Sequence, residues 1–167
     1  RVTLYFLIAI WLGTFAPCAS AQSQPIDSLQ KAIIVYERSS KTKALTLKDT
    51  ALVNLYHGLA VAYSGNDLKA AMNYANKELL LSRKLKFNKG IASVYNLIGT
   101  LYESKSDFSQ AVRYYKLSLA ISKKINNKTA EAFAYGNIGN IYGKQSNYGE
   151  AIKYQLLAQG LAKQLND

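Results

Sequence analysis

The chain has 167 residues, a single cysteine and a formal net charge of +11, with 21 Lys and Arg residues against 10 Asp and Glu residues. One cysteine excludes an internal disulfide, and carboxylates this few and scattered argue against paired acid/base catalysis. The excess lysines recur along the chain without interleaved aromatic residues, which favours solvated helix faces over a nucleic-acid-binding run.

The first expected element, residues 1–21, is a signal peptide. Arg1 leads an apolar run over residues 2–16 that falls short of the roughly 20 residues of a membrane-spanning helix. Residues 19–21 (Ala-Ser-Ala) match a small-residue cleavage site, so we expect cleavage after Ala21 and an exported protein of the periplasm or cell envelope. Two alternatives stay open: a buried N-terminal helix, and lipidation of Cys18, for which Ala16-Pro17 is a poor processing site.

Residues 22–50 form the next expected region, an N-terminal helical cap. Helical spacing runs from Asp27 to Tyr36 and again from Leu47 to Ala51, but neither stretch shares the pattern that follows. We expect this region to cover the first face of the remaining fold.

Residues 51–167 contain an internal repeat of 40 residues. The pattern predicts three units, at about 51–90, 91–130 and 131–167, the last of them cut short. The first unit lacks one residue in the turn before Asp67, and Ala60 stands where the later units have Gly. The repeat is carried by two matching sets of residues: Tyr95, Ile98, Gly99 and Tyr102, then Tyr135, Ile138, Gly139 and Tyr142.

Each unit is expected to fold as two helices, because apolar residues recur at steps of three and four on either side of a polar break. Three residues are placed to cap the second helices: Asp67, Asp107 and Asn147. Gly90 and Asn126-Asn127 stand where we expect helices to end. Small residues predict close helix crossings, between Gly99 and Ala111 and again between Gly139 and Ala151.

The motif of Tyr95, Ile98, Gly99 and Tyr102 followed by Ala111 and Tyr115, with its copy in the third unit, resembles the tetratricopeptide repeat. The resemblance covers roughly residues 52–167 and implies an all-α fold, a right-handed α-solenoid of stacked antiparallel helix hairpins. The family unit has about 34 residues, so a 40-residue period implies longer helices, as in the subclass related to kinesin light chains and bacterial peptide-sensing regulators. Gln155, where an aromatic is usual, and Ser118, where Ala is preferred, depart from the pattern.

In such arrays the first helix of each unit lines a concave surface, and its residues that do not pack internally meet the ligand. Their amide side chains pair with an extended peptide backbone, which favours an uncharged peptide groove. The alternative is that these residues merely solvate an open face. When the groove positions of the family are mapped one by one onto this sequence, the resemblance implies these groove residues: Asn54, His57, Val61, Asn96, Thr100, Glu103, Phe133, Asn137 and Asn140.

We expect no catalytic, cofactor or metal site. His57 is the only histidine and has no second metal ligand. The glycines lack the strand-then-loop context of a phosphate-binding motif, and no serine has partners to activate it. No small-molecule substrate and no nucleic acid are expected as partners.

The leading functional hypothesis is a non-catalytic protein- or peptide-binding scaffold. The alternative is the extracytoplasmic sensor portion of a membrane histidine kinase or other signalling protein, because the predicted order of segments is similar to exported sensor arrays of that kind. Ile152, Leu156, Leu161 and Leu165 leave an apolar face on the last helix. We therefore expect either a parent protein that continues beyond residue 167, where an output domain would lie, or self-association through this face.

Overall fold

The computed structural model describes residues 20–40 and 50–166, and this part of the chain contains seven helices and no strand. Of the expected signal peptide, residues 1–19, which include Cys18, lie outside the described residues. No helix in the described ranges is long and apolar enough to cross a membrane. The helices are α1 (Ser20–Ser40), α2 (Thr50–Tyr63), α3 (Leu68–Lys84), α4 (Asn88–Ser104), α5 (Phe108–Lys124), α6 (Lys128–Lys144) and α7 (Tyr148–Asn166).

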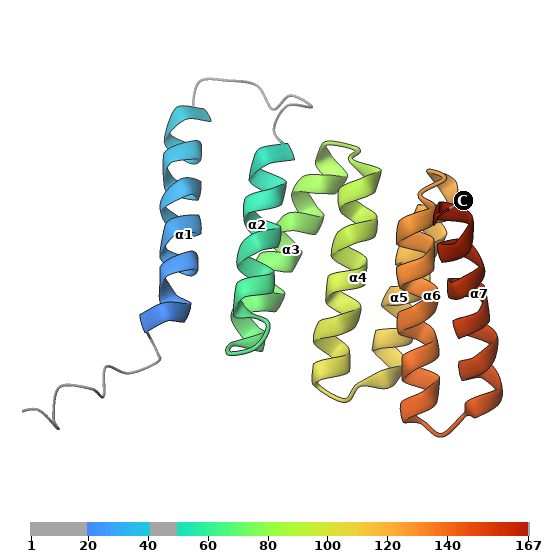
Figure 1. Cartoon of the computed structure of the whole chain (residues 1–167). Coiled ribbons are helices and arrows are strands. Elements are labelled where there is room, and N and C mark those ends of the chain that lie inside the picture. Colours follow the sequence, from blue (N-terminus) through green and yellow to red (C-terminus); the bar gives the residue numbers. More distant parts are fainter. Residues whose placement is uncertain (1–19, 41–49, 167) are drawn as a thin grey trace, which may run out of the picture.

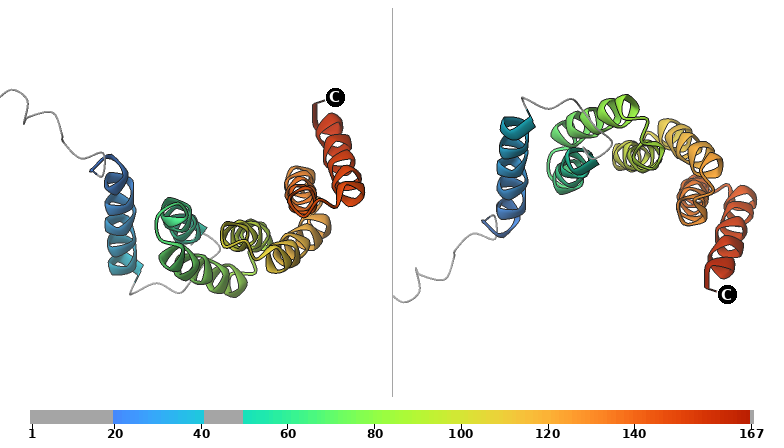
Figure 2. Two further views of the ribbon diagram at one scale, coloured as in Figure 1. Left: turned by 90° about the horizontal axis from the view of Figure 1, so that it is seen from below. Right: turned by 90° about the horizontal axis from the view of Figure 1, so that it is seen from above.

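Helices α2 to α7 form three antiparallel hairpins, α2/α3, α4/α5 and α6/α7, which stack side by side into an arc with α1 beside α2 (Figures 1 and 2). Helices α2, α4 and α6 contact one another in succession, whereas α3, α5 and α7 do not. The first helices of the hairpins therefore line the inner, concave side, as the resemblance implied. The predicted all-α, right-handed repeat solenoid is confirmed.

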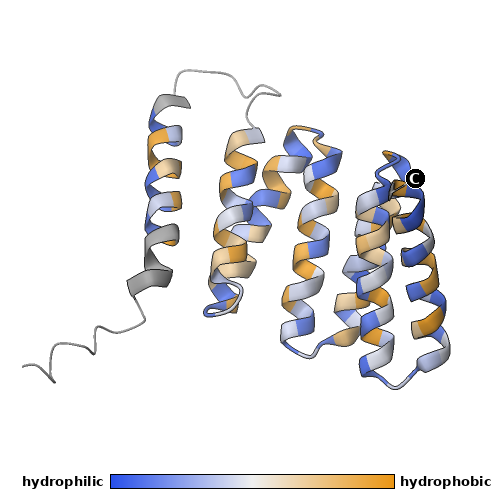
Figure 3. Cartoon of the chain, in the orientation of Figure 1, coloured by the Kyte–Doolittle hydropathy of each residue, from blue (hydrophilic) through white to orange (hydrophobic). Residues whose placement is uncertain are grey.

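The core forms because each helix carries an apolar stripe between polar ones (Figure 3). In α4, the buried residues Val94, Ile98 and Leu101 pack on Ala71 and Ala75 of α3, which are fully buried as well. Small residues on one helix and branched residues on the next let the helices approach closely. Neighbouring hairpins thus complete one another's core, which is why the stack holds together.

The last four turns, α3–α4, α4–α5, α5–α6 and α6–α7, share one pattern of closing hydrogen bonds. In the α5–α6 turn, Asn126 takes a left-handed φ of 54° and its N–H donates to the Lys123 carbonyl at 3.1 Å. The Asn127 N–H donates to the Ser122 carbonyl at 2.9 Å, which completes a Schellman motif. The corresponding left-handed residues are Lys86, Ser106 and Ser146.

The predicted helix caps are confirmed at three places. Asp67 accepts the Ala70 N–H at 2.9 Å, Asp107 accepts the Gln110 N–H at 3.1 Å, and Asn147 accepts the Glu150 N–H at 3.3 Å. Asn127 adds a cap at the start of α6, where it accepts the Ala130 N–H at 3.1 Å. Each hairpin turn therefore ends one helix and starts the next within a few residues.

One expectation about glycine was wrong. Gly90 does not end a helix but lies buried in the first turn of α4, where an added Cβ would lie 2.7 Å from Oγ of Ser82 on α3. Gly99 lies against Tyr115 of α5, since its added Cβ would lie 2.6 Å from the tyrosine ring. At Gly139 the expected neighbour is correct, because the Ala151 carbonyl oxygen lies 3.2 Å away.

Candidate functional site

The concave side carries two hollows that meet at Thr129 and Phe133 of α6, and together we call them the inner groove. The first, of about 550 Å³, lies over α2, α4 and α6. The second, of about 1080 Å³, lies over α6 and α7 and reaches Glu103 of α4. Phe133 is 65% exposed and stands at the junction of the hollows.

The structure brings most of the predicted groove residues together. The first hollow is lined by His57, Val61, Asn96, Thr100 and Phe133, and the second by Glu103, Phe133 and Asn140. Two residues differ from the expectation: Asn54 is exposed but lines neither hollow, and Asn137 is occupied in a contact between hairpins. Its Nδ2 donates to Oδ1 of Asn96 at 2.9 Å, which ties α6 to α4.

At the α2 end of the groove, His57 is held by a carboxylate from the second helix of its hairpin. Its Nδ1 lies 3.1 Å from Oε2 and 3.2 Å from Oε1 of Glu78, a side chain that is 1% exposed. The hydrogen bond to Glu78 raises the pKa of His57, while burial raises the pKa of Glu78. Nδ1 is engaged by the carboxylate, and the imidazole borders the first hollow.

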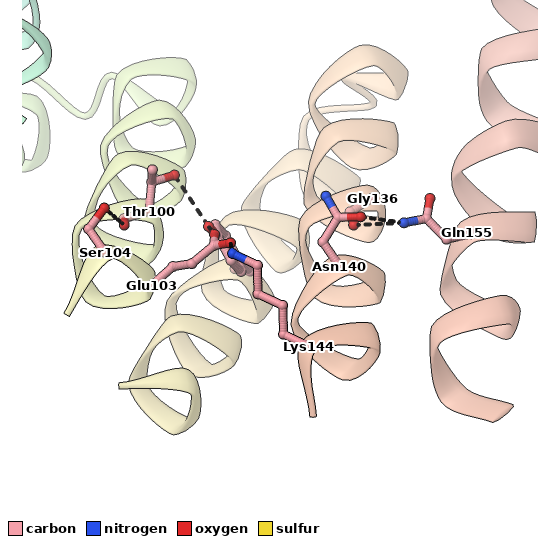
Figure 4. A network of polar contacts seen from close by, with 8 residues as sticks. Thr100, Glu103, Ser104, Gly136, Asn140, Lys144 and Gln155 are labelled. Atoms are coloured by element: carbon pink, nitrogen blue, oxygen red, sulfur yellow. Dashed lines mark hydrogen bonds and ion pairs between the residues drawn. The ribbon is translucent and has the colours of Figure 1, made fainter. Parts of the chain in front are cut away.

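A polar network crosses the middle of the groove (Figure 4). The Tyr115 hydroxyl donates to Oε2 of Glu103 at 2.7 Å and lies 3.3 Å from Oγ1 of Thr100. Lys144 of α6 donates to Oε1 of Glu103 at 2.7 Å, so the carboxylate bridges two hairpins. Burial raises the pKa of Tyr115, so its hydroxyl keeps its proton near neutral pH.

The α7 side of the groove is held by Gln155. Its Nε2 donates to Oδ1 of Asn140 at 2.7 Å and to the Gly136 carbonyl at 3.3 Å (Figure 4). Gln155 stands 40 residues after Tyr115 and fills the equivalent place opposite a glycine. At this position, the amide hydrogen bonds of Gln155 therefore replace the packing of an aromatic ring against the glycine.

Sequence reasoning missed four residues that shape the groove: Glu78, Tyr115, Lys144 and Gln155. Three of them lie on second helices, which were assigned to packing alone. Glu78 did carry a clue, because it occupies the position of Ser118 in the next unit, where the family prefers a small apolar residue. A charged residue at a buried position requires a partner, and His57 is the nearest candidate on the paired helix.

The groove has the chemistry of a binding surface. Apart from His57, the charged residues lining the two hollows are Lys89, which has a free ammonium group among the described residues, and the Glu103–Lys144 pair. Within residues 20–40 and 50–166, no three His, Cys, Asp or Glu side chains gather closely enough to hold a metal ion. The remaining lining is amide, hydroxyl and apolar, which suits a partner held by hydrogen bonds and apolar contact.

Comparison with known proteins agrees with this architecture. Residues 88–164, which span most of α4 to α7, match the tetratricopeptide repeat family. No curated protein matches the chain. Among solved structures, the crystal structure of BtubC (BKLC) from P. vanneervenii is similar, with a TM-score of 0.74 and 20% identity over 87% of this chain. This chain spans 59% of that chain, and at this identity the likeness shows the fold alone.

Proposed function

We propose that this chain, whose residues 88–164 match the tetratricopeptide repeat family, is a non-catalytic scaffold that binds an extended protein or peptide segment in its inner groove. The observation that carries the proposal is Phe133, a large aromatic side chain 65% exposed at the junction of two hollows. Exposed aromatic residues at the centre of a concave surface are typical anchors of binding energy.

The polar groups on either side of Phe133 support a peptide as the partner. Within the described residues, Nδ2 of Asn96 and Nδ2 of Asn140 have no hydrogen-bond acceptor, whereas the oxygen of each amide is already used. Each amide therefore offers a donor to the groove. Peptide carbonyl groups are acceptors that satisfy such donors whatever the peptide sequence.

A displayed peptide library selected against the full chain tests the proposal. We expect selected peptides to lose at least tenfold in affinity when Phe133→Ala removes the anchor, a loss of about 1.4 kcal/mol. Leu80→Ala is the matched control, because Leu80 is 72% exposed on α3, away from the groove. Failure to enrich any peptide, or an equal loss in both variants, would contradict groove binding.

We also propose export, which rests on the apolar run and the Ala-Ser-Ala site near the N-terminus. Alkaline phosphatase fused after residue 167 tests it, because this reporter is active only after export. An active fusion, with activity lost when the apolar run is deleted, is the expected result. An inactive but stable fusion would place the chain inside the cell.

The second candidate function is the sensor portion of a membrane histidine kinase or related signalling protein. It is favoured by the apolar residues on α7 that no described element covers, Ile152 and Leu156, each 61% exposed. A signalling parent would use this face to join the array to its output region or to a second copy. Sequencing the gene beyond the codon for residue 167 tests this function. A membrane segment and a kinase domain there would support it, and a stop codon would exclude it.

A further inference from the structure

The excess positive charge of this chain is not spread evenly over the array. The α3–α4 turn, the α5–α6 turn and the end of α7 lie along one edge (upper edge in Figure 1), which we call the basic rim. Among its described residues there are eight cations and one carboxylate, Glu131, which is 3% exposed. The cations are Arg83, Lys84, Lys86, Lys89, Lys123, Lys124, Lys128 and Lys163, all exposed.

The opposite edge, the balanced rim, provides an internal comparison. Its described charges, at the α2–α3, α4–α5 and α6–α7 turns and the adjoining helix turns, are five cations and four carboxylates. They are Lys69, Lys105, Arg113, Lys144 and Lys153, with Asp67, Glu103, Asp107 and Glu150. The end of α1 reaches the basic rim with Glu37 and Arg38, whose charges cancel. One edge of the array is thus strongly positive, whereas the cations and carboxylates of the other nearly cancel.

Folding accounts for only some of these cations. Those in the last turns of α3, α5 and α7 interact favourably with the helix dipole. In addition, Arg83 donates to the Tyr95 hydroxyl at 2.7 Å, and Lys128 pairs with Glu131 at 3.2 Å. These residues would be retained without any partner.

For two lysines on the basic rim, the folded structure offers no stabilising interaction of this kind. Lys89 lies in the first turn of α4, where the helix dipole disfavours a cation, and no described residue forms an ion pair with it. Lys86 has a left-handed φ of 54°, a conformation that favours Asn and Gly, and the next unit has Asn126 at this place. Both lysines add charge to an edge that is already positive, and the fold gains nothing from that repulsion.

We propose that the basic rim docks the array, edge on, against an anionic lipid surface. The three rim segments lie at the same edge of the array, so one surface placed against this edge meets all of them (Figure 1). Seven of the eight cations are lysines, whose flexible point charges suit lipid phosphates without fixed geometry. In this orientation the inner groove opens to the side and stays free for a peptide.

Nucleic acid fits the basic rim less well. Proteins that hold single strands stack bases on exposed aromatic rings. The strongly exposed aromatic residues of the described chain are Phe133, in the inner groove, and Tyr148, at the start of α7 on the balanced rim. The basic rim therefore offers charge without a stacking surface.

Flotation of the full chain with vesicles tests the proposal. We expect binding to vesicles of phosphatidylcholine with phosphatidylglycerol, weakening steeply as salt rises, and little binding to phosphatidylcholine alone. The variant Lys84→Gln/Lys86→Gln/Lys124→Gln should bind at least tenfold more weakly, since each engaged lysine contributes roughly fivefold. The control Lys69→Gln/Lys105→Gln/Lys116→Gln removes the same charge elsewhere and should bind like the unaltered chain.

The design separates the rim from other causes of binding. The apolar N-terminal run is present in every variant, so it cannot produce a difference between them, and circular dichroism checks that all remain helical. An equal loss in both variants would assign binding to net charge and overturn the proposal. Tighter binding of a duplex or single-stranded oligonucleotide at the same salt, with the same dependence on Lys84, Lys86 and Lys124, would replace lipid with nucleic acid.

Discussion

At the residue scale, His57 and Glu78 place an ionisable pair where the other hairpins have none. Glu78 occupies the position that Ser118 holds 40 residues later, where the serine hydroxyl donates to the Ala92 carbonyl at 2.7 Å. The carboxylate is buried and has a histidine on the paired helix as its partner. A buried carboxylate without its partner is costly, so the two residues are expected to act on stability as a unit.

This pair makes stability depend on pH. The pKa of His57 is raised in the folded chain, so its contribution is complete below the ordinary value of 6.5 and is lost as pH rises through the folded value. The raised pKa of Glu78 acts with the same sign from 4.5 upward. We expect the midpoint of urea unfolding to be lower at pH 8.5 than at pH 6, and His57→Gln to reduce this difference. A midpoint that rises with pH would show that the pair is wrongly described.

Two glycines offer a second test at the same scale. An added Cβ at Gly99 would lie 2.6 Å from the ring of Tyr115, which is fully buried, whereas one added at Gly160 would meet no neighbouring side chain or helix within 4 Å. We expect Gly99→Ala to destabilise the chain by about 1–3 kcal/mol through overpacking. Gly160→Ala should instead stabilise it by up to about 1 kcal/mol, the helix propensity difference. Thermal unfolding of both variants measures the contrast, and similar effects would mean that Gly99 is not tightly packed.

At the element scale, each hairpin depends on a turn that closes one helix and caps the next. Asp107→Ala removes the acceptor for the Gln110 N–H and should cost about 1 kcal/mol. Asp107→Asn should retain most of the stability, because an amide oxygen performs this role at Asn127 and Asn147. Chemical denaturation compares the variants. If Asn fails to rescue, the charge of Asp107 matters more than its hydrogen bond.

The elements were predictable because their determinants are local. The 40-residue repeat, the helical spacing and the capping residues all lie within one unit, and the hairpins follow from them. Gly90 was misassigned because glycine serves both helix ends and close helix contacts, and only the neighbouring Ser82 distinguishes the two. The groove was predicted incompletely for a similar reason, since Glu78 and Tyr115 reach it from second helices across the hairpin.

At the scale of the whole molecule, α7 differs from its counterparts α3 and α5, which are each covered by the next hairpin. Val112 of α5 is half-buried and packs against that neighbour, but the matching Ile152 of α7 is exposed, as is Leu165. Leu156 adds a third exposed apolar residue at the place of Lys116. Exposed apolar residues that gather on one helix mark an interaction surface.

We therefore expect the purified chain to self-associate through α7. Ile152→Asp/Leu156→Asp should shift it to the monomer in light scattering after size exclusion, because burying a carboxylate at an apolar interface without a partner is unfavourable. Leu80→Asp/Leu117→Asp places the same charges on the outer faces of α3 and α5 and should leave the association unchanged. A chain that stays monomeric at all concentrations, or that responds equally to both variants, would leave the α7 face to a different protein, and binding would then require that partner rather than a second copy.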